Sequence, residues 1–436
     1  MTTTPPGKGP RIVIVGGGAG GVELATRLGR RLGQHKADVI LVDRNPAHLW
    51  KPRLHEVAVG LIGSGDDETS YLAHGHAHGY EFSLGELIGL DTARRTIRIS
   101  GVRSTESGEQ ILDARDVGYD ILVLALGSRV NDFGVPGVLD HCHMLDSPAQ
   151  AQHLQRSFLE AAVQVTMGRL DRLRIGIVGA GATGVELAAE LHHAVHAMER
   201  YGGLGAAGRL DITLIDRADR VLPAVDRRTS EHALAALQRL GVKVLLGQGV
   251  ERVTRDAFHL TDGETVPCEI KVWASGVTGH DVVDALAGLT LLKGKRIAVD
   301  SHLACVGVEN IFAIGDCAAA PADGGAGLLP PTAQVAHQQA AYLAQALPQR
   351  MAGRSVAAFR FRPRGTLVSL GADQAAGEIP TRRNQSVVPL RGVLAKLLYV
   401  SLYHMHRVTL HGWLRATALF LADRLRRTTL PPVKLH

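Results

Sequence analysis

Cysteines and long apolar runs are scarce in this chain. The four cysteines, Cys142, Cys268, Cys305 and Cys317, are scattered, and no two have CxxC spacing. This spacing argues against a disulfide framework, a zinc site or a redox dithiol, and it favours a reducing compartment. No run of about 18 apolar residues occurs, so we expect no conventional membrane-spanning helix. Met1–Pro10 lacks an apolar core, and we therefore expect no signal peptide.

Length and glycine content set the expected class. The chain has 436 residues, which predicts two or three domains. Its hydrophobic content of 45% and charged content of 21% are ordinary for a folded globular protein. The 50 glycines are too many for a helical bundle. They fit a fold that turns sharply between strands and helices and brings its backbone close to phosphates.

Positive charge is concentrated at the C-terminal end. Residues 391–436 contain eight Lys or Arg against the single acid Asp423, a net charge of +7. The whole chain carries +6, so the remainder carries −1. Any prediction about binding partners must therefore account for this tail.

An internal repeat is the strongest sequence feature. IVIVGGGAGGVELATRLG begins at Ile12, and IGIVGAGATGVELAAELH begins at Ile175. Each copy reads as a buried strand, a GxGxxG turn and a helix. In such a turn the first glycine permits tight bending, the second lets a pyrophosphate approach, and the third lets the helix pack on the strand. The helix N-terminus then offers free N–H groups to the phosphates. The glycines are Gly16, Gly18 and Gly21 in the first copy, and Gly179, Gly181 and Gly184 in the second.

An acid follows each glycine-rich turn at the end of a second predicted strand. ADVILVD ends at Asp43, and LDITLID ends at Asp216. Such a carboxylate binds ribose hydroxyls. We therefore predict two dinucleotide sites. Asp216 favours NADH over NADPH, because a carboxylate repels a 2′-phosphate, although the adjacent Arg217 weakens that preference.

Two further strand ends indicate which turn holds FAD. In NIFAIGDCAA the strand ends at Gly315–Asp316, where a carboxylate can accept hydrogen bonds from ribityl hydroxyls. YDILVLALGS is a buried strand that ends in a small-residue turn at Gly127. Both flank a central block that contains the second repeat. This order resembles the flavoproteins with two dinucleotide-binding domains, in which WASGV would place Ser275 and Gly276 beside the nicotinamide.

The predicted fold is α/β, with two Rossmann-like domains and an amphipathic helical C-terminal segment that anchors the protein to a membrane. We expect an NADH-binding domain inserted into a discontinuous FAD-binding domain. The boundaries are 9–150 and 296–384 for the FAD domain, 151–295 for the NADH domain, and 385–436 for the membrane-associated segment.

Two segments of the sequence indicate which electron acceptor the flavin would use. Dithiol reductases need a cysteine pair soon after the first ribose-binding acid, and NPAHLWKPRLHEVAVG contains none. Sulfide-oxidising relatives also need cysteines at the flavin. LLPPTAQVAHQQAAYLAQAL instead predicts a helix with Pro330 and Pro331 in its first turn, Thr332 as its cap, and Gln334 and Gln338 on one face. These amides can bind quinone carbonyls, or they can belong to an ordinary amphipathic helix with solvated glutamines.

Several of these motifs together make the resemblance specific. AQVAHQQ, WKPRLHE, GATGVE and the ending VKLH resemble the type II, non-pumping NADH:quinone oxidoreductases, from about residue 9 to the C-terminus. The resemblance implies non-covalent FAD, NADH at the second turn, and quinone at the opposite face of the flavin. It implies that Ala333 and Gln334 of the AQxAxQQ pattern lie at the FAD, and that Lys51 is a basic residue near it. Glu186 of the NADH site would lie near the junction of nicotinamide and flavin and assist proton transfer, and Lys396 is a candidate lysine at the quinone pocket.

The tail predicts a helix lying in a membrane interface. Apolar residues recur at helical spacing from Val393 to Leu425, with basic residues between them. Tyr399, Tyr403 and Trp413 suit a membrane–water interface, and the basic residues suit anionic lipid. Packing on the FAD domain or in a homodimer is the alternative. No recognition motif supports a nucleic-acid partner.

One histidine-rich stretch could suggest a metal site. His74, His76 and His78 alternate in YLAHGHAHGY, which would place them on one face if the stretch were a strand. Its glycines favour a loop instead, so we predict no metal site.

The sequence thus predicts a peripheral enzyme on the cytoplasmic face of a bacterial inner membrane. It would oxidise NADH through FAD and reduce a membrane quinone by two electrons, without pumping protons, to feed a respiratory chain. Two alternatives stay open: a soluble NADH-dependent reductase of a small redox protein, and a non-catalytic NADH-sensing flavoprotein.

Overall fold

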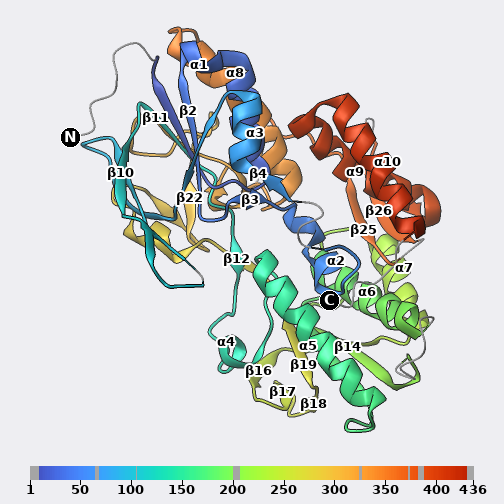
Figure 1. Ribbon diagram of the computed structural model, residues 1–436. Coiled ribbons are helices and arrows are strands. Elements are labelled where there is room, and N and C mark those ends of the chain that lie inside the picture. The colour runs from blue at the N-terminus through green and yellow to red at the C-terminus, as the bar shows by residue number, and fades with distance from the viewer. Residues whose placement is uncertain are drawn as a thin grey trace. The chain divides into compact units, whose positions relative to one another are not determined.

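The computed structural model describes residues 9–63, 68–104, 106–199, 207–323, 327–371, 374–381 and 387–429. The chain divides into two compact units (Figure 1). Unit 1 comprises Met1–Trp50, Glu68–Arg129 and Val277–Arg362; unit 2 comprises Lys51–Asp67, Val130–Gly276 and Pro363–His436. Each unit contains a parallel sheet with helices, which confirms the predicted α/β class.

Unit 1 is built on a five-stranded sheet in which every pairing is parallel. Its strands, in order across the sheet, are β23 (Ile311–Ala313), β11 (Ile121–Leu124), β1 (Arg11–Val15), β2 (Asp38–Asp43) and β5 (Glu81–Leu84). The central strand is inaccessible from Ile12 to Ile14, as its run of β-branched residues predicts. Helix α1 (Ala19–Lys36) follows β1 and packs beside α8 (Ala333–Met351).

The remaining elements of unit 1 are short. They are the helix α3 (Tyr71–His78), the 3₁₀ turns η3 (Asp281–Ala285) and η4 (Gly315–Cys317), the antiparallel sheet β10 (Arg115–Gly118), β7 (Thr96–Ile99) and β6 (Leu87–Asp91), the sheet β21 (Leu291–Leu292), β22 (Arg296–Ala298) and β24 (Ala318–Ala319), and the pairs β3 (Ala47–His48) with β4 (Thr69–Ser70) and β8 (Val102–Arg103) with β9 (Gln110–Leu112). Strands β12 (Arg129–Val130) and β20 (Val277–Thr278) lie where the chain passes between the units.

Unit 2 has a four-stranded sheet that is also wholly parallel. Its order is β15 (Lys243–Leu246), β14 (Leu210–Asp216), β13 (Leu173–Val178) and β19 (Ile270–Trp273). In both units the strand that precedes a glycine-rich turn is internal, with the second strand on one side and a later strand on the other. That position is the switch point where open α/β sheets bind ligands.

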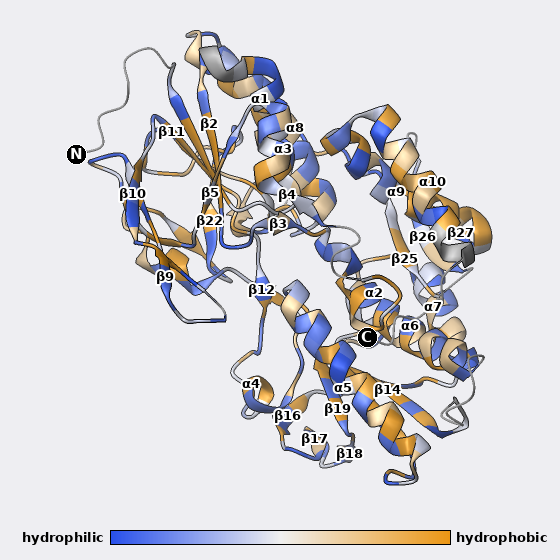
Figure 2. Ribbon diagram, in the orientation of Figure 1, coloured by the Kyte–Doolittle hydropathy of each residue, from blue (hydrophilic) through white to orange (hydrophobic). Residues whose placement is uncertain are grey.

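Helices and smaller sheets complete unit 2. They are η1 (Lys51–Arg53), α2 (Leu54–Ala58), α4 (Val138–His141), α5 (Pro148–Thr166), α6 (Ala182–Glu199), η2 (Ala207–Arg209), α7 (Arg227–Arg239), the antiparallel sheet β16 (Val250–Val253), β17 (Ala257–Leu260) and β18 (Thr265–Pro267), and the antiparallel sheet β25 (Thr366–Ser369), β26 (Ala375–Pro380) and β27 (Val387–Arg391). The chain continues into α9 (Gly392–His411) and α10 (Trp413–Thr429). Figure 2 shows apolar and polar residues interspersed along both helices.

Helices α9 and α10 are joined by a buried charged cluster. Arg407 forms an ion pair with Asp423 of α10, and its guanidinium lies 5.0 Å from the centre of the Tyr403 ring. Arg53 lies 4.5 Å from the centre of the same ring. Tyr403 therefore contacts two cations that are themselves buried. Tyr403 is half-buried, and two guanidinium groups pack against its ring.

Two local expectations are corrected. The stretch that contains His74, His76 and His78 is the helix α3 and not a loop. Ser70 caps its start and Gly79, in the left-handed region, ends it. Pro330 and Pro331 precede α8 instead of occupying its first turn, although Thr332 does cap the helix, as predicted, by accepting a hydrogen bond from Val335 N.

None of the described helices combines the length and the apolar content that a bilayer-spanning helix requires.

Candidate dinucleotide and electron-transfer site

The first glycine-rich turn, between β1 and α1, has the geometry that its motif predicts. Gly16 has φ +104°, and a Cβ there would lie 2.2 Å from Ala125 O. A Cβ on Gly21 would lie 1.8 Å from Gly16 O, so only glycine lets the helix start against the turn. Gly18 has no neighbouring atom within 4 Å of such a Cβ. The turn is thus closed at its first and third glycines and open at its second, where a pyrophosphate approaches.

Asp43 lies beside this turn at the carboxyl end of β2. Its Oδ2 accepts a hydrogen bond from Gly17 N at 2.6 Å, and burial raises the pKa of its carboxyl above the usual range. Gly17 O in turn accepts from the Tyr71 hydroxyl at 2.7 Å and lies 2.9 Å from His48 Nδ1. Neither Tyr71 nor His48 belongs to a recognisable motif, so neither could be predicted from the sequence.

The two strand ends predicted to flank the flavin meet in unit 1. Ser128 Oγ, which follows Gly127, donates to Asp316 Oδ2 at 2.7 Å. Gly315 N donates to Oε1 of Gln339, which is fully buried on α8. Ser128 and Gln339 are therefore positioning residues of the Gly315–Asp316 turn. Their role depends on contacts between segments that are distant in the chain, so no local motif predicts it.

The first turn of α8 lies against both of these features. A Cβ on Gly20 of the glycine-rich turn would be 3.4 Å from the Ala336 Cβ, and one on Gly315 would be 3.5 Å from the same atom. The N-terminus of α8, with Ala333 and Gln334, thus adjoins the predicted FAD site. Positive helix-end charge at such a place favours an anionic group.

The polar residues of α8 are held in different ways. Gln338 Nε2 donates to Arg362 O at 2.8 Å, and Arg362 N donates to Gln338 Oε1 at 3.0 Å. Both ends of this amide are therefore engaged by one residue's backbone. His337 Nδ1 lies 2.6 Å from Oε2 of Glu23, which is fully buried on α1. Gln334 and Gln338 share a face of the helix, as predicted.

The second glycine-rich turn, between β13 and α6, repeats the first one. Gly179 has φ +113°, a Cβ on Gly184 would lie 1.9 Å from Gly179 O, and Gly181 is open. Asp216 Oδ2 accepts from Ala180 N, as Asp43 does from Gly17 N. In both copies of the sequence repeat, the acid therefore accepts a hydrogen bond from the residue that follows the first glycine. A Cβ on Gly179 would also lie 2.6 Å from Ala274 O, which places the Ser275–Gly276 turn directly beside this glycine-rich turn. We call the turn at Gly16–Gly21 the first finger and the turn at Gly179–Gly184 the second finger.

Glu186, in the first half of α6, occupies a buried polar pocket. Its Oε1 accepts from Ser369 N at 2.9 Å, and its Oε2 lies 3.5 Å from His55 Nδ1. Burial raises the pKa of Glu186 to about 8, with nearby acids adding to the effect, and burial lowers the pKa of His55 to about 4. Both shifts favour the uncharged form of the group. Glu186 can hold a proton near neutrality.

Lys396 completes this pocket from α9. Its Nζ donates to Ser369 Oγ and to Gly371 O, each at 2.8 Å. Ser369 Oγ also lies 3.2 Å from Oε1 of the buried Glu190. Tyr399 donates toward Glu186, and burial raises the pKa of its hydroxyl well above the usual range. Tyr399 was expected at a membrane interface; the structure places its hydroxyl against Glu186 instead.

Lys51 lies in η1 of unit 2, whereas the first finger lies in unit 1. Its Nζ pairs with Asp146 Oδ1 at 3.0 Å. Among the residues that the structure describes, no three His, Cys, Asp or Glu side chains are placed to hold a metal ion.

Comparisons with known proteins decide the family. The pyridine nucleotide-disulphide oxidoreductase family matches residues 10–340. A type II NADH:quinone oxidoreductase of Haemophilus influenzae is 38% identical over 98% of this chain and 99% of its own length. The chain belongs to the type II NADH:quinone oxidoreductases. This confirms the resemblance that AQVAHQQ and the other motifs indicated.

More distant members of the family agree with this. The type II NADH:quinone oxidoreductase of Staphylococcus aureus is 27% identical over 85% of the chain and 89% of its own length. The structure of NDH2 from Plasmodium falciparum in complex with NADH superposes with a TM-score of 0.84. It covers 98% of this chain and 100% of that one at 18% identity, which shows the shared fold.

The glycine geometry predicts that substitution of Gly184 lowers stability, whereas substitution of Gly181 weakens NAD⁺ binding. Gly184→Ala would drive a Cβ into Gly179 O and should lower the thermal midpoint by several degrees. Gly181→Ala should leave that midpoint unchanged but weaken NAD⁺ binding at least tenfold, because its Cβ enters the open side of the turn. Calorimetry measures both quantities. Equal stability losses in the two variants would contradict this interpretation.

The raised pKa of Glu186 predicts a stability effect with a definite sign. Between pH 4.5 and 8 the unfolded chain has released this proton while the folded chain keeps it, so stability falls as pH rises. The cost approaches about 1.4 kcal/mol for each pKa unit of difference. Glu186→Gln should therefore lose less stability than wild type from pH 5 to 9, measured as thermal midpoints. Parallel curves would show that the carboxyl is not protonated in the folded state.

Proposed function

We propose that this chain oxidises NADH and reduces a membrane quinone by two electrons, without pumping protons. The observation that carries the proposal is the pair of matching fingers, one in each unit, in a chain 38% identical to a type II NADH:quinone oxidoreductase. Two such fingers allow two dinucleotides to be bound at once, which electron transfer from one to the other requires.

FAD is assigned to the first finger, with residues 9–150 and 296–384 as its domain. Gly16, Gly18 and Gly21 would face its pyrophosphate, and Asp43 its adenosine ribose. Gly127, Asp316 and the first turn of α8, with Ala333 and Gln334, would border the rest. Bound FAD supplies a two-electron carrier between NADH and quinone. Lys51 would be a basic residue near the flavin, and its Nζ pairs with Asp146 in this structure.

NADH is assigned to the second finger, with residues 151–295 as its domain. Gly179, Gly181 and Gly184 would hold its pyrophosphate, Asp216 its ribose, and Ser275 and Gly276 its nicotinamide end. Asp216 accepts one backbone hydrogen bond at each oxygen, from Ala180 N and from Ala218 N, which orients its carboxylate. Each oxygen keeps a further lone pair that can accept from a ribose hydroxyl. A 2′-phosphate at this carboxylate would be repelled.

Quinone is assigned to the α8 side, where Gln334 and Gln338 share one face. The reciprocal bonds between Gln338 and Arg362 indicate that Gln338 acts there by holding the extended segment that follows α8. Glu186 would assist proton transfer, and Lys396 is the candidate lysine of the quinone site. Ser369 positions both, because its backbone N–H donates to Glu186 and its hydroxyl accepts from Lys396. A soluble redox protein as acceptor would not require these groups.

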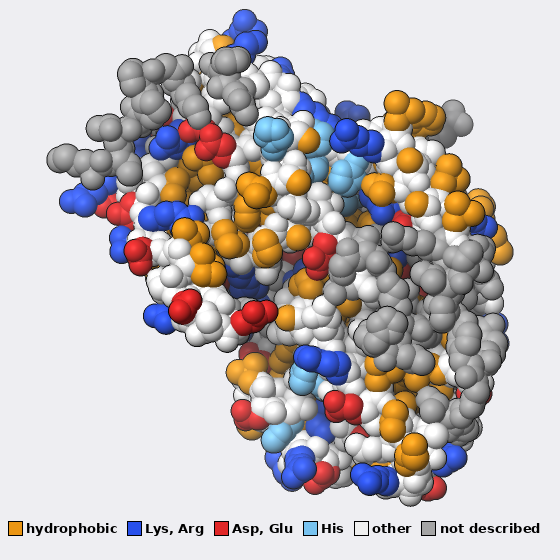
Figure 3. All heavy atoms as spheres, viewed as in Figure 1, with side chains coloured by type: hydrophobic (Ala, Val, Ile, Leu, Met, Phe, Trp, Pro, Cys, Tyr) orange, Lys and Arg blue, Asp and Glu red, His pale blue; other side chains and the backbone are white. Residues whose placement is uncertain are grey.

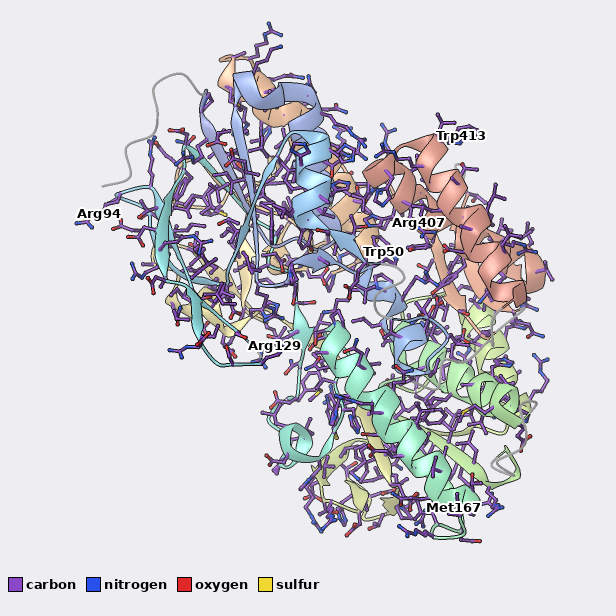
Figure 4. All side chains as sticks on the ribbon, viewed as in Figure 1. Trp50, Arg94, Arg129, Met167, Arg407 and Trp413 are labelled. Atoms are coloured by element: carbon purple, nitrogen blue, oxygen red, sulfur yellow. The ribbon has the colours of Figure 1, made fainter. Side chains whose placement is uncertain are left out.

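The C-terminal segment, 385–436, is proposed to bind the cytoplasmic membrane surface of a bacterium. Apolar side chains gather on the outer side of α9 and α10 (Figure 3). Trp413 is 67% and Leu414 78% exposed, and Trp413 points away from the protein (Figure 4). Lys396 and Arg407 turn inward, so they do not contribute to lipid binding. Arg391, Arg415 and Arg424 are exposed; the side chains of Arg426 and Arg427 and all of Lys434 lie outside the described residues.

Quinone dependence is tested on the detergent-solubilised holoenzyme. NADH oxidation, followed by absorbance, should accelerate at least tenfold when a short-chain quinone is added, because quinone removes the electrons that NADH delivers. NADPH should be oxidised far more slowly. Rapid bleaching of the flavin by NADH without any acceleration by quinone would favour the soluble reductase or the sensor.

Membrane binding is tested with anionic phospholipid vesicles. The double change Trp413→Ser and Leu414→Ser should weaken co-sedimentation about tenfold, since each exposed apolar side chain contributes on the order of 1 kcal/mol or more when it enters the interface. Met167→Ser removes an equally exposed apolar side chain, 71% accessible, from the end of α5 and is the matched control. Equal losses in both variants, or none in either, would refute the assignment to this segment.

A further inference from the structure

Phe133 has an unusual backbone conformation. It lies in the sequence Asn131–Gly134 with φ +52°, in the left-handed region that a bulky side chain rarely adopts. Gly134 follows with φ +68°. Strain of this kind persists only where surrounding structure imposes it, and it concentrates at functional sites.

Three hydrogen bonds impose this conformation. Phe133 N donates to Asn131 Oδ1 at 2.9 Å. Asn131 O accepts from the indole of the buried Trp273 at 2.8 Å, and Asn131 N donates to Gly276 O. The turn that contains Phe133 is therefore tied to both ends of the Trp273–Gly276 segment.

The Phe133 ring lies directly on Gly276. A Cβ on Gly276 would be 2.4 Å from Cζ of this ring. Despite that contact, Phe133 is 53% exposed. The hydrogen bonds of Asn131 hold the apolar ring partly exposed at this position.

This ring adjoins the second finger through a continuous series of contacts. Gly179, the first glycine of the finger, packs against Ala274 O, and Ala274 leads through Ser275 to Gly276 under the ring. The open side of the finger is at Gly181. A dinucleotide that starts there and extends along the Ala274–Gly276 turn reaches the ring with the end opposite its adenine.

We propose that Phe133 is part of the NADH site and that its exposed ring packs against the nicotinamide end of the dinucleotide at the Gly276 turn. This inference rests on the assignment of NADH to the second finger. A flat apolar ring beside a small-residue turn offers a planar heterocycle both a stacking surface and close backbone approach. The strained backbone keeps the ring oriented before the ligand arrives, which reduces the ordering that binding requires.

The experiment uses the oxidised holoenzyme and NAD⁺ as the probe. Phe133→Gly removes the ring at a φ that glycine adopts freely, so the thermal midpoint should be equal to or above that of wild type. The dissociation constant for NAD⁺, measured by calorimetry, should rise at least fivefold. Phe133→Tyr keeps the ring and should retain wild-type affinity.

Leu139→Ala is the matched control. Leu139 is 68% exposed in the adjacent helix α4, and its loss should change neither quantity. Unchanged NAD⁺ affinity in Phe133→Gly would overturn the inference. A lower thermal midpoint with unchanged affinity would assign the ring a structural role instead. Failure of the wild-type chain to bind NAD⁺ would overturn the NADH assignment itself, and the Phe133 inference with it.

Discussion

Each glycine-rich turn depends on one close contact, in which the third glycine lies against the carbonyl oxygen of the first. A Cβ at Gly21 or Gly184 would come within 2 Å of that oxygen. Because no side chain intervenes, the helix starts at once and its free N–H groups face the open second glycine. The acid at the end of the next strand then holds the turn through its backbone N–H, in Asp43 and Asp216 alike.

The buried pocket around Glu186 follows from the second of these turns. Glu186 is two residues beyond Gly184, so the geometry that positions α6 also buries this carboxyl. Ser369 and Lys396 reach it from β25 and α9, and His55 from α2. The C-terminal segment therefore contributes to the core of unit 2 on one side and presents apolar residues to solvent on the other. This dual use explains why the hydroxyl of Tyr399 lies at Glu186 whereas Trp413 is exposed.

Local sequence patterns predicted much of this site, because the interactions that set its backbone conformation join residues close in sequence. The alternation of strand, glycine turn and helix specifies its own backbone, so both fingers, both acids and the Thr332 cap could be predicted from residues close in sequence. The histidines of α3 show the limit of that reasoning. Glycine suggested a loop there, but a Ser70 cap and burial of Tyr71 and His74 stabilise a helix.

The sequence by itself determined the α/β class, the two fingers and the family, because glycine geometry and strand periodicity act over a few residues. Only the tertiary structure decided how the remaining polar side chains are used. It directed Gln339 to Gly315, Gln338 to the backbone of Arg362, and Arg407 to Tyr403 and Asp423. Such partners are brought together by packing between distant segments. A residue's own neighbours in sequence carry no information about them.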